Sequence, residues 1–175
     1  MQTLSLEDIE QLNQSILQLY TLRNLDTFGL DSLSIVDRLV PGEIPMFHLN
    51  HGATSKLDYV CLEGFRLTAE LERTMYQYFG THPIVDNMPQ TLTSAHKISD
   101  FITQQQLHQF EGLYQQFLRV HQIEDQMVLF LPDANPDTWQ KLTHFDTKLV
   151  GFTQNRDGRT FTERDRLILN LLRHI

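Results

Sequence analysis

Apolar positions recur along this chain with two periods, one typical of helices and one typical of strands. Spacings of three and four residues predict helices over residues 5–23, 32–40, 66–79, 103–120 and 162–175. Shorter runs predict strands: "IPMFHLNH" and "KLDYVCLEG" as a hairpin around "GATS", then "QMVLFLP", then, after a turn region at "ANPDTW", "HFDTKLVGFTQN". Antiparallel strands with helices grouped around them predict an α+β domain.

The first and last helices carry clear start signals and pronounced apolar stripes. Ser5 with Asp8, and Thr162 with Asp165, stand at the positions of a capping box. The last stripe continues to the end of the chain, and apolar surface in excess of what a core needs tends to mark an interface. We therefore expect a homodimer, although both stripes could instead pack within one monomer. The expected interface residues are Ile9, Leu12, Ile16, Leu19, Ile168, Leu171, Leu172 and Ile175.

The loosest part of the chain is "GTHPIVDNMPQTLTSAHKISDF", residues 80–101. Long polar loops in compact domains are usually lids or binding loops. The helices beside this loop are rich in aromatic residues, which either complete the core or line a pocket. We expect a pocket for a small apolar or planar molecule between the sheet and these helices. Its expected lining is Tyr59, Tyr76, Phe79, His82, Phe101, Phe110, Tyr114 and Phe117.

Composition and charge narrow the classes of partner. With 175 residues, 41% of them hydrophobic, the chain suits one domain, residues 1–175. Its 14 Lys and Arg residues are scattered among 22 Asp and Glu, which disfavours direct binding to nucleic acid or to an anionic membrane. Neither a signal peptide nor a run of 18 apolar residues occurs. Cys61 is the only cysteine, so we expect a cytoplasmic protein without an intrachain disulfide.

No residue pattern is typical of a catalytic or metal centre. The eight histidines show no zinc-site spacing, and His48 and His51 fall on opposite faces of a predicted strand. Cys61 lies in an apolar run, where we expect a small buried side chain rather than a nucleophile. The chain also lacks Gly-rich phosphate loops and a nucleophile elbow. We therefore expect neither an enzyme nor a cofactor or metal.

The second half of the chain resembles a known family. "FTERDRLILNLLRH" resembles the segment "F-[ST]-E-R-D-R-x-x-L-x-x-L-R-P-H" that closes the GAF-like sensory domain of LuxR-type bacterial transcription regulators. "ISDFITQQQLHQFEGLYQQFLRVHQIEDQMVLFLP" and "VGFTQNRDGRTFTERDR" are similar to the regions before that segment, so the resemblance runs from Ile98 to His174. The family usually has proline immediately before the histidine, whereas Arg173 precedes His174 here.

This resemblance implies a GAF/PAS-like antiparallel sheet with flanking helices, in which the N- and C-terminal helices pack together. It implies a sensory domain that binds a small-molecule effector, dimerises and signals through the closing helix, residues 162–175, to a DNA-binding domain absent from this chain. Two alternatives stay open: a small-molecule-binding module, or a pure dimerisation module, without a DNA-binding segment. GAF-type methionine sulfoxide reductases use several cysteines, and bilin-binding GAF domains commonly have His after the attachment cysteine. Cys61 is alone and precedes Leu62.

Overall fold

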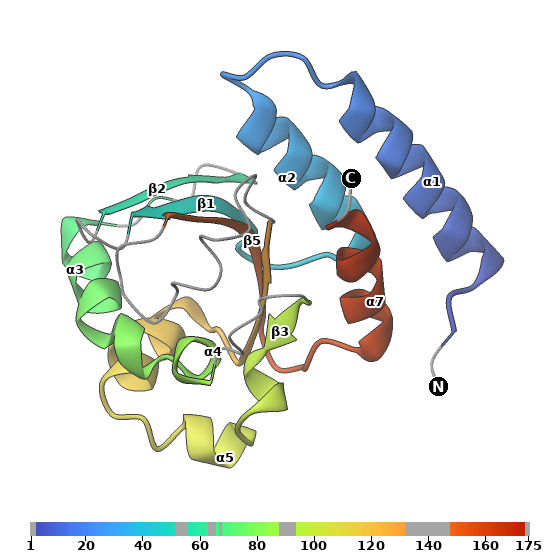
Figure 1. Cartoon of the computed structure of the whole chain (residues 1–175). Coiled ribbons are helices and arrows are strands. Elements are labelled where there is room, and N and C mark those ends of the chain that lie inside the picture. Colours follow the sequence, from blue (N-terminus) through green and yellow to red (C-terminus); the bar gives the residue numbers. More distant parts are fainter. Residues whose placement is uncertain are drawn as a thin grey trace.

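The structure, a computed structural model, describes residues 3–51, 56–62, 66, 68–87, 94–131 and 148–173 (Figure 1). Helices α1 (Leu6–Thr21) and α2 (Phe28–Leu39) precede the strands β1 (Met46–His51) and β2 (Lys56–Cys61). A helical region follows, with one short strand in it: α3 (Ala69–Tyr78), η3 (Phe79–Thr81), α4 (Pro83–Asp86), β3 (His96–Lys97), η4 (Ile98–Asp100), α5 (Gln104–Leu107), η5 (Tyr114–Leu118) and η6 (Arg119–His121). Strands β4 (Asp125–Phe130) and β5 (Lys148–Arg156) lead to helix α7 (Glu163–Leu172).

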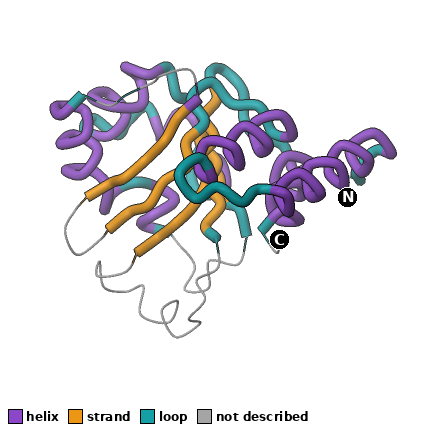
Figure 2. Tube along the Cα trace, turned by 90° about the horizontal axis from the view of Figure 1, so that it is seen from above, coloured by secondary structure: helices purple, strands orange, loops and turns teal. Residues whose placement is uncertain are grey.

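The five strands form one antiparallel sheet in the order β2-β1-β5-β4-β3. Strand β5 lies at the centre, where Phe152 is opposite Phe47 of β1 and Leu129 of β4. Helices lie on both sides of this sheet (Figure 2). The order of the strands and the flanking helices match a GAF/PAS-like fold, so the predicted α+β class is confirmed.

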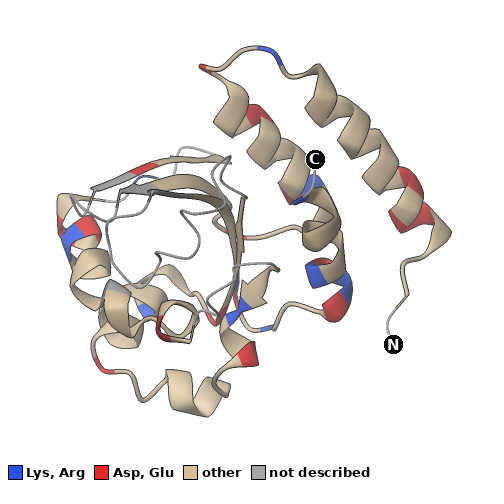
Figure 3. Ribbon diagram, viewed as in Figure 1, with Lys and Arg blue, Asp and Glu red and all other residues tan. Residues whose placement is uncertain are grey.

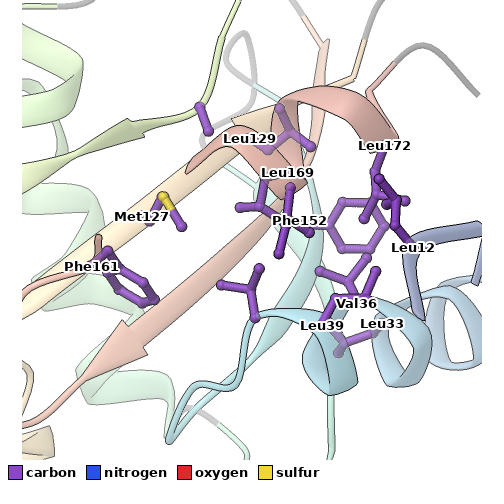
Figure 4. Packing of buried hydrophobic residues seen from close by; sticks show 13 residues of the cluster. Leu12, Leu33, Val36, Leu39, Met127, Leu129, Phe152, Phe161, Leu169 and Leu172 are labelled. Carbon is purple, nitrogen blue, oxygen red and sulfur yellow. The ribbon is translucent and has the colours of Figure 1, made fainter. Parts of the chain in front are cut away.

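One face of the sheet packs against α1, α2 and α7 (Figure 4). Side chains at alternate strand positions point to this side because successive residues of a strand face opposite ways. Met127, Leu129 and Phe152 thereby meet buried residues of the three helices, a set that we call the first core. Its helical members are Leu12, Leu33, Val36, Leu39, Ile168, Leu169 and Leu172. Each side chain fully buried here contributes roughly 1.5–3 kcal/mol.

The predicted capping boxes begin both end helices. The hydroxyl of Ser5 accepts a hydrogen bond from the N–H of Asp8 (3.1 Å), and that of Thr162 accepts one from the N–H of Asp165 (3.2 Å). Arg164 of α7 donates from Nε to Oδ1 of Asp8 in α1 (2.9 Å). Together with the shared first core, this contact confirms that the N- and C-terminal helices pack together.

The apolar stripes of these two helices serve mainly the monomer, which corrects their assignment to a dimer interface. Five of the eight expected interface residues are buried in the first core or packed against it: Leu12, Ile16, Leu19, Ile168 and Leu172. Ile9 and Leu171 stay exposed, and Ile175 lies outside the described residues. The physical reason is that a helix needs one such stripe to cover its own core, and these five residues supply it.

Two predicted helices differ from those observed. Helix α2 begins at Phe28, four residues before the predicted start. The helix expected over residues 103–120 is broken into α5, a turn, the π-helix η5 and the 3-10 helix η6. Gly112 lies in the break, and a side chain there would meet the Tyr78 ring at 2.2 Å. The ring of α3 therefore packs directly against the backbone of this turn, a tertiary contact that local periodicity cannot indicate.

The segment 80–101 is more ordered than a loop in its described parts. His82 caps the short helix α4, and Pro83 occupies its first position, where the missing N–H costs nothing. Residues 96–97 form the edge strand β3. The predicted turns at 52–55 and in "ANPDTW" and the start of the last predicted strand, residues 144–147, lie outside the described residues. Within the described part, no helix is long and apolar enough to cross a membrane.

Candidate ligand-binding site

A cavity of about 100 Å³ lies between the second face of the sheet and the helices α3, α4 and η5. This volume is the space open to the centre of a water molecule, of which one water needs only about 10–15 Å³. The cavity therefore has room for a small organic molecule. Its walls come from the sheet and from the helical region between β2 and β4.

The sheet wall follows from the alternation of the strands. Because Phe47, Met127, Leu129 and Phe152 face the first core, their neighbours face the cavity. These neighbours are Met46 and His48 of β1, Gln126, Val128 and Phe130 of β4, and Thr153 and Asn155 of β5.

Gly151 at the centre of the sheet keeps this wall open. It pairs with His48 on one side and with Phe130 on the other. A side chain at Gly151 would meet the backbone oxygen of Leu129 at 2.5 Å. With no side chain between them, the rings of His48 and Phe130 approach edge to face, with centroids 6.2 Å apart.

Apart from His82 and His121, the helical wall is apolar, and most of it belongs to a second core. Met75 comes from α3, Ile84 and Val85 from α4, and Leu113 and Phe117 from the region of η5. Ile84, Leu113 and Phe117 are buried together with residues of β4 in this second core. The cavity is thus a gap left within a packed layer, and its rim is fixed by side chains that also stabilise the fold.

His82 places a hydrogen-bond donor without a partner on this wall. Its Nδ1 accepts a hydrogen bond from the N–H of Ile84 (3.2 Å), so the proton of the neutral ring is on Nε2. Nε2 is buried and has no partner at hydrogen-bonding distance among the described residues, although the side chain of Gln126 acts against the lowering of the His82 pKa. Burial lowers the pKa of His82 to about 4, which keeps the ring neutral at physiological pH.

Two further imidazoles line the cavity. Burial lowers the pKa of His48 to about 4, and its Nδ1 lies 3.4 Å from the hydroxyl of Thr153. Burial also lowers the pKa of His121, whose ring meets Phe117 edge-on with centroids 5.3 Å apart. The amides of Gln126 and Asn155 bond to each other (2.8 Å), and Asn155 donates to the carbonyl of Ile44 (2.6 Å). Most polar groups of the wall are therefore satisfied, in contrast to His82 Nε2.

The described lining contains no Asp, Glu, Lys or Arg. A charged ligand would lose its hydration on entering and gain no counter-charge from these residues. Across the described chain, no group of three or more His, Cys, Asp or Glu residues is placed to hold a metal ion. The chemistry of the wall suits an uncharged molecule that is largely apolar and carries a hydrogen-bond acceptor.

This fold occurs in a known ligand-binding domain. The structure matches the crystal structure of the VqsR LBD domain (ligand-binding domain) from Pseudomonas aeruginosa, with a TM-score of 0.57 over 97% of this chain and 92% of that chain. The two sequences are 13% identical, so the match shows a shared fold. No protein-family model and no curated protein matches the sequence.

Two of the eight residues expected in the pocket line the cavity, His82 and Phe117. Phe101 and Phe110 pack against the second core from its edge, and Tyr114 is buried within it. The hydroxyl of Tyr114 donates to Glu124 (2.6 Å), and its ring stacks on His108 at 4.4 Å. These three residues thus form core or surface structure beside the cavity.

The other three expected residues lie on α3, η3 and β2. Burial, together with the nearby charges of Glu72 and Asp58, raises the pKa of Tyr76 to about 12. Tyr59 is half-buried on β2, and the side chain of Phe79 lies outside the described part of the structure. Neither Tyr59 nor Tyr76 is among the lining residues, so their role as ligand contacts stays a prediction.

Sequence analysis missed the sheet wall, including His48, Thr153 and Asn155. The aromatic residues that suggest a pocket lie on the helices, whereas the positions of the strands that face the cavity are mostly small or polar. A signal was available, since alternation in "IPMFHLNH" places Met46 and His48 on one face and Phe47 and Leu49 on the other. It becomes informative only once the helices covering each face are known.

Proposed function

We propose that this chain is the sensory domain of a LuxR-type bacterial transcription regulator and that its cavity binds an uncharged small molecule. The observation that carries the proposal is the apolar cavity with a buried donor, His82 Nε2, that lacks a hydrogen-bond partner among the described residues. The fold shared with the VqsR ligand-binding domain and the sequence resemblance over residues 98–174 support it independently. We propose that the chain is the regulatory half of such a protein and that it is of GAF type.

The ligand class follows from the wall. A buried donor that is left unpaired costs roughly 1–3 kcal/mol, and a ligand acceptor removes that cost. The thioethers of Met46 and Met75 and the rings of Phe117 and Phe130 offer polarisable apolar contacts. We therefore propose a compact neutral molecule with a carbonyl or ether oxygen that reaches His82.

The proposed regulator acts through another domain, and this chain neither binds DNA nor catalyses a reaction. Arginines at the start of α7 lie among acidic residues (Figure 3). Arg156 pairs with Asp165 (2.8 Å), and Arg166 pairs with Asp100 and Glu163, so these cations are occupied rather than presented to phosphate. The chain's net charge of −8 also disfavours contact with a polyanion. We propose that the domain works in the cytoplasm and passes its signal through the closing helix.

Methionine methyl groups offer a direct test. Met46 and Met75 line the cavity, whereas Met127 is buried on the opposite side of the sheet. The protein is labelled with ¹³C at its methionine methyl groups and titrated with three probes, each followed by NMR. Acetophenone is neutral and has a hydrogen-bond acceptor, ethylbenzene is neutral and has none, and benzoate is charged. We expect acetophenone to change the chemical shifts of the Met46 and Met75 methyl groups until binding saturates. Ethylbenzene should bind more weakly, and benzoate should give no saturable change. Met127 serves as the internal control.

The variant His82→Asn isolates the donor. Asparagine preserves the helix cap, since its side-chain oxygen accepts the N–H of Ile84, but it is too short to replace Nε2. We expect the variant to weaken acetophenone binding about tenfold, the effect of one hydrogen bond, and to leave ethylbenzene binding unchanged. If none of the three probes shifts the cavity methyls, the proposal is wrong and the chain is better explained as a dimerisation module.

A further inference from the structure

Helix α1 carries a second apolar stripe beside the face that packs against the first core. Leu6, Ile9, Leu17 and Tyr20 are 73%, 44%, 68% and 57% exposed. The helix forms the outer edge of the molecule, with α2 and α7 on its inner side (Figures 1 and 2). Four large exposed apolar side chains on one helix exceed the scattered exposure that is normal on a protein surface.

The stripe is symmetric about Asn13. Leu6 and Tyr20 lie seven residues before and after Asn13, and Ile9 and Leu17 lie four residues before and after it. All five residues fall within about a quarter of the helix circumference, given 3.6 residues per turn. An antiparallel copy of the same helix therefore brings Leu6 against Tyr20, Ile9 against Leu17, and Asn13 against itself.

We propose that two copies of this chain associate through α1, antiparallel, with a two-fold axis at Asn13. Such an axis requires a self-complementary surface, which the stripe supplies. The distribution of charge selects the direction. Glu7, Asp8 and Glu10 are in the first half of α1, and the helix has no basic residue. A parallel pair would place these acids beside their copies, whereas the antiparallel pair places them beside a neutral half and opposes the two helix dipoles.

Asn13 fixes the register of the pair. Its amide both donates and accepts, so two copies facing each other on the axis satisfy one another. A single asparagine in an apolar helix seam specifies register in this way at some cost in affinity. This interface replaces the one expected from Leu12, Ile16 and Leu19, which serve the first core, and it does not depend on the ligand-binding proposal.

Concentration-dependent molar mass tests the association. The contact of one helix pair is smaller than the about 800 Å² per partner of a standard interface, so we expect a dimer of roughly micromolar affinity. Sedimentation equilibrium is measured for the unchanged chain, for Leu17→Glu and for Leu171→Glu. Leu171 is a matched control, since it is also an exposed leucine but lies on another helix, α7. We expect Leu17→Glu to weaken dimerisation at least tenfold and Leu171→Glu to leave it unchanged. A monomer at every concentration, or the reverse pattern of the two variants, overturns the proposal.

Cysteine crosslinking tests direction and register. In a Cys61→Ser background, Asn13→Cys places one thiol on the axis, and mild oxidation should link two chains by a disulfide. Leu6→Cys and Tyr20→Cys should each stay uncrosslinked alone and form a mixed disulfide when combined. A Leu6→Cys homodimer would show a parallel pair and contradict the proposal. Leu6, Asn13 and Tyr20 are exposed in the monomer, so the three cysteine substitutions leave its core intact.

Discussion

At the scale of single residues, the buried histidines make the stability of the domain sensitive to acid. Burial lowers the pKa of His82 and His48 from 6.5 to about 4 in the folded chain. Between pH 6.5 and 4 the unfolded chain therefore binds more protons than the folded one, and the free energy of unfolding falls as the pH falls. Each of the two histidines should cost about 2 kcal/mol between pH 7.5 and pH 5.

Urea unfolding of the unchanged chain and of His82→Asn at the two pH values checks this expectation. The variant should lose about 2 kcal/mol less on acidification than the unchanged chain. Its stability at pH 7.5 supplies the control, because any loss of packing by asparagine appears there without titration. Equal losses in both proteins would mean that His82 is not held neutral by burial. The burial of these two rings could not be predicted from the sequence, since nothing in their local pattern distinguishes them from the other six histidines.

At the scale of elements, the two capping boxes use the same local motif with different tertiary partners. Asp165 is buried and accepts from Arg156 (2.8 Å) as well as from its own cap. Asp8 is on the outer helix and meets Arg164. Asp165→Asn removes one partner of a buried ion pair, which typically costs 3–5 kcal/mol. We expect Asp8→Asn to be destabilising too, but clearly less so, and thermal or urea unfolding of the two variants side by side measures the difference. Equal losses of stability in the two variants would show that the capping hydrogen bonds, and not the buried ion pair, determine the effect.

Elements whose ends are set by residues close in the sequence could be predicted from it. Elements that depend on contacts between distant segments could not. The starts of α1 and α7 follow from Ser5 and Thr162, whose partners lie three residues away. The break before η5 depends on Tyr78 packing against Gly112, a contact between separate elements. The cavity belongs to the second kind. Phe117 and His82 lie in segments already suspected, whereas His48 became a site residue only through the strand order that places Gly151 beside it.

At the scale of the whole molecule, one sheet is shared by two layers of helices. Strand β4 directs Met127 and Leu129 into the first core and Val128 and Phe130 into the second. Both faces of this strand carry apolar side chains, so losing the helices on one side would expose apolar surface of a strand that the other side also requires. This coupling gives the cavity a physical connection to α7, because both layers pack against the same strands.

We therefore expect the domain to unfold in one cooperative step. A substitution on the core side of α7 should then lower the stability of the cavity wall as well. Leu169 is fully buried in the first core, and Leu169→Ala should lower the free energy of unfolding by about 2–5 kcal/mol. The methyl signals of Met127 in the first core and Met75 on the cavity wall report the two layers separately during urea unfolding. Both signals should move to the same lower midpoint in the variant, as a two-state transition requires. If Met75 keeps its original midpoint while Met127 shifts, the two layers unfold independently, and ligand binding in the cavity would have no route through the sheet to the closing helix.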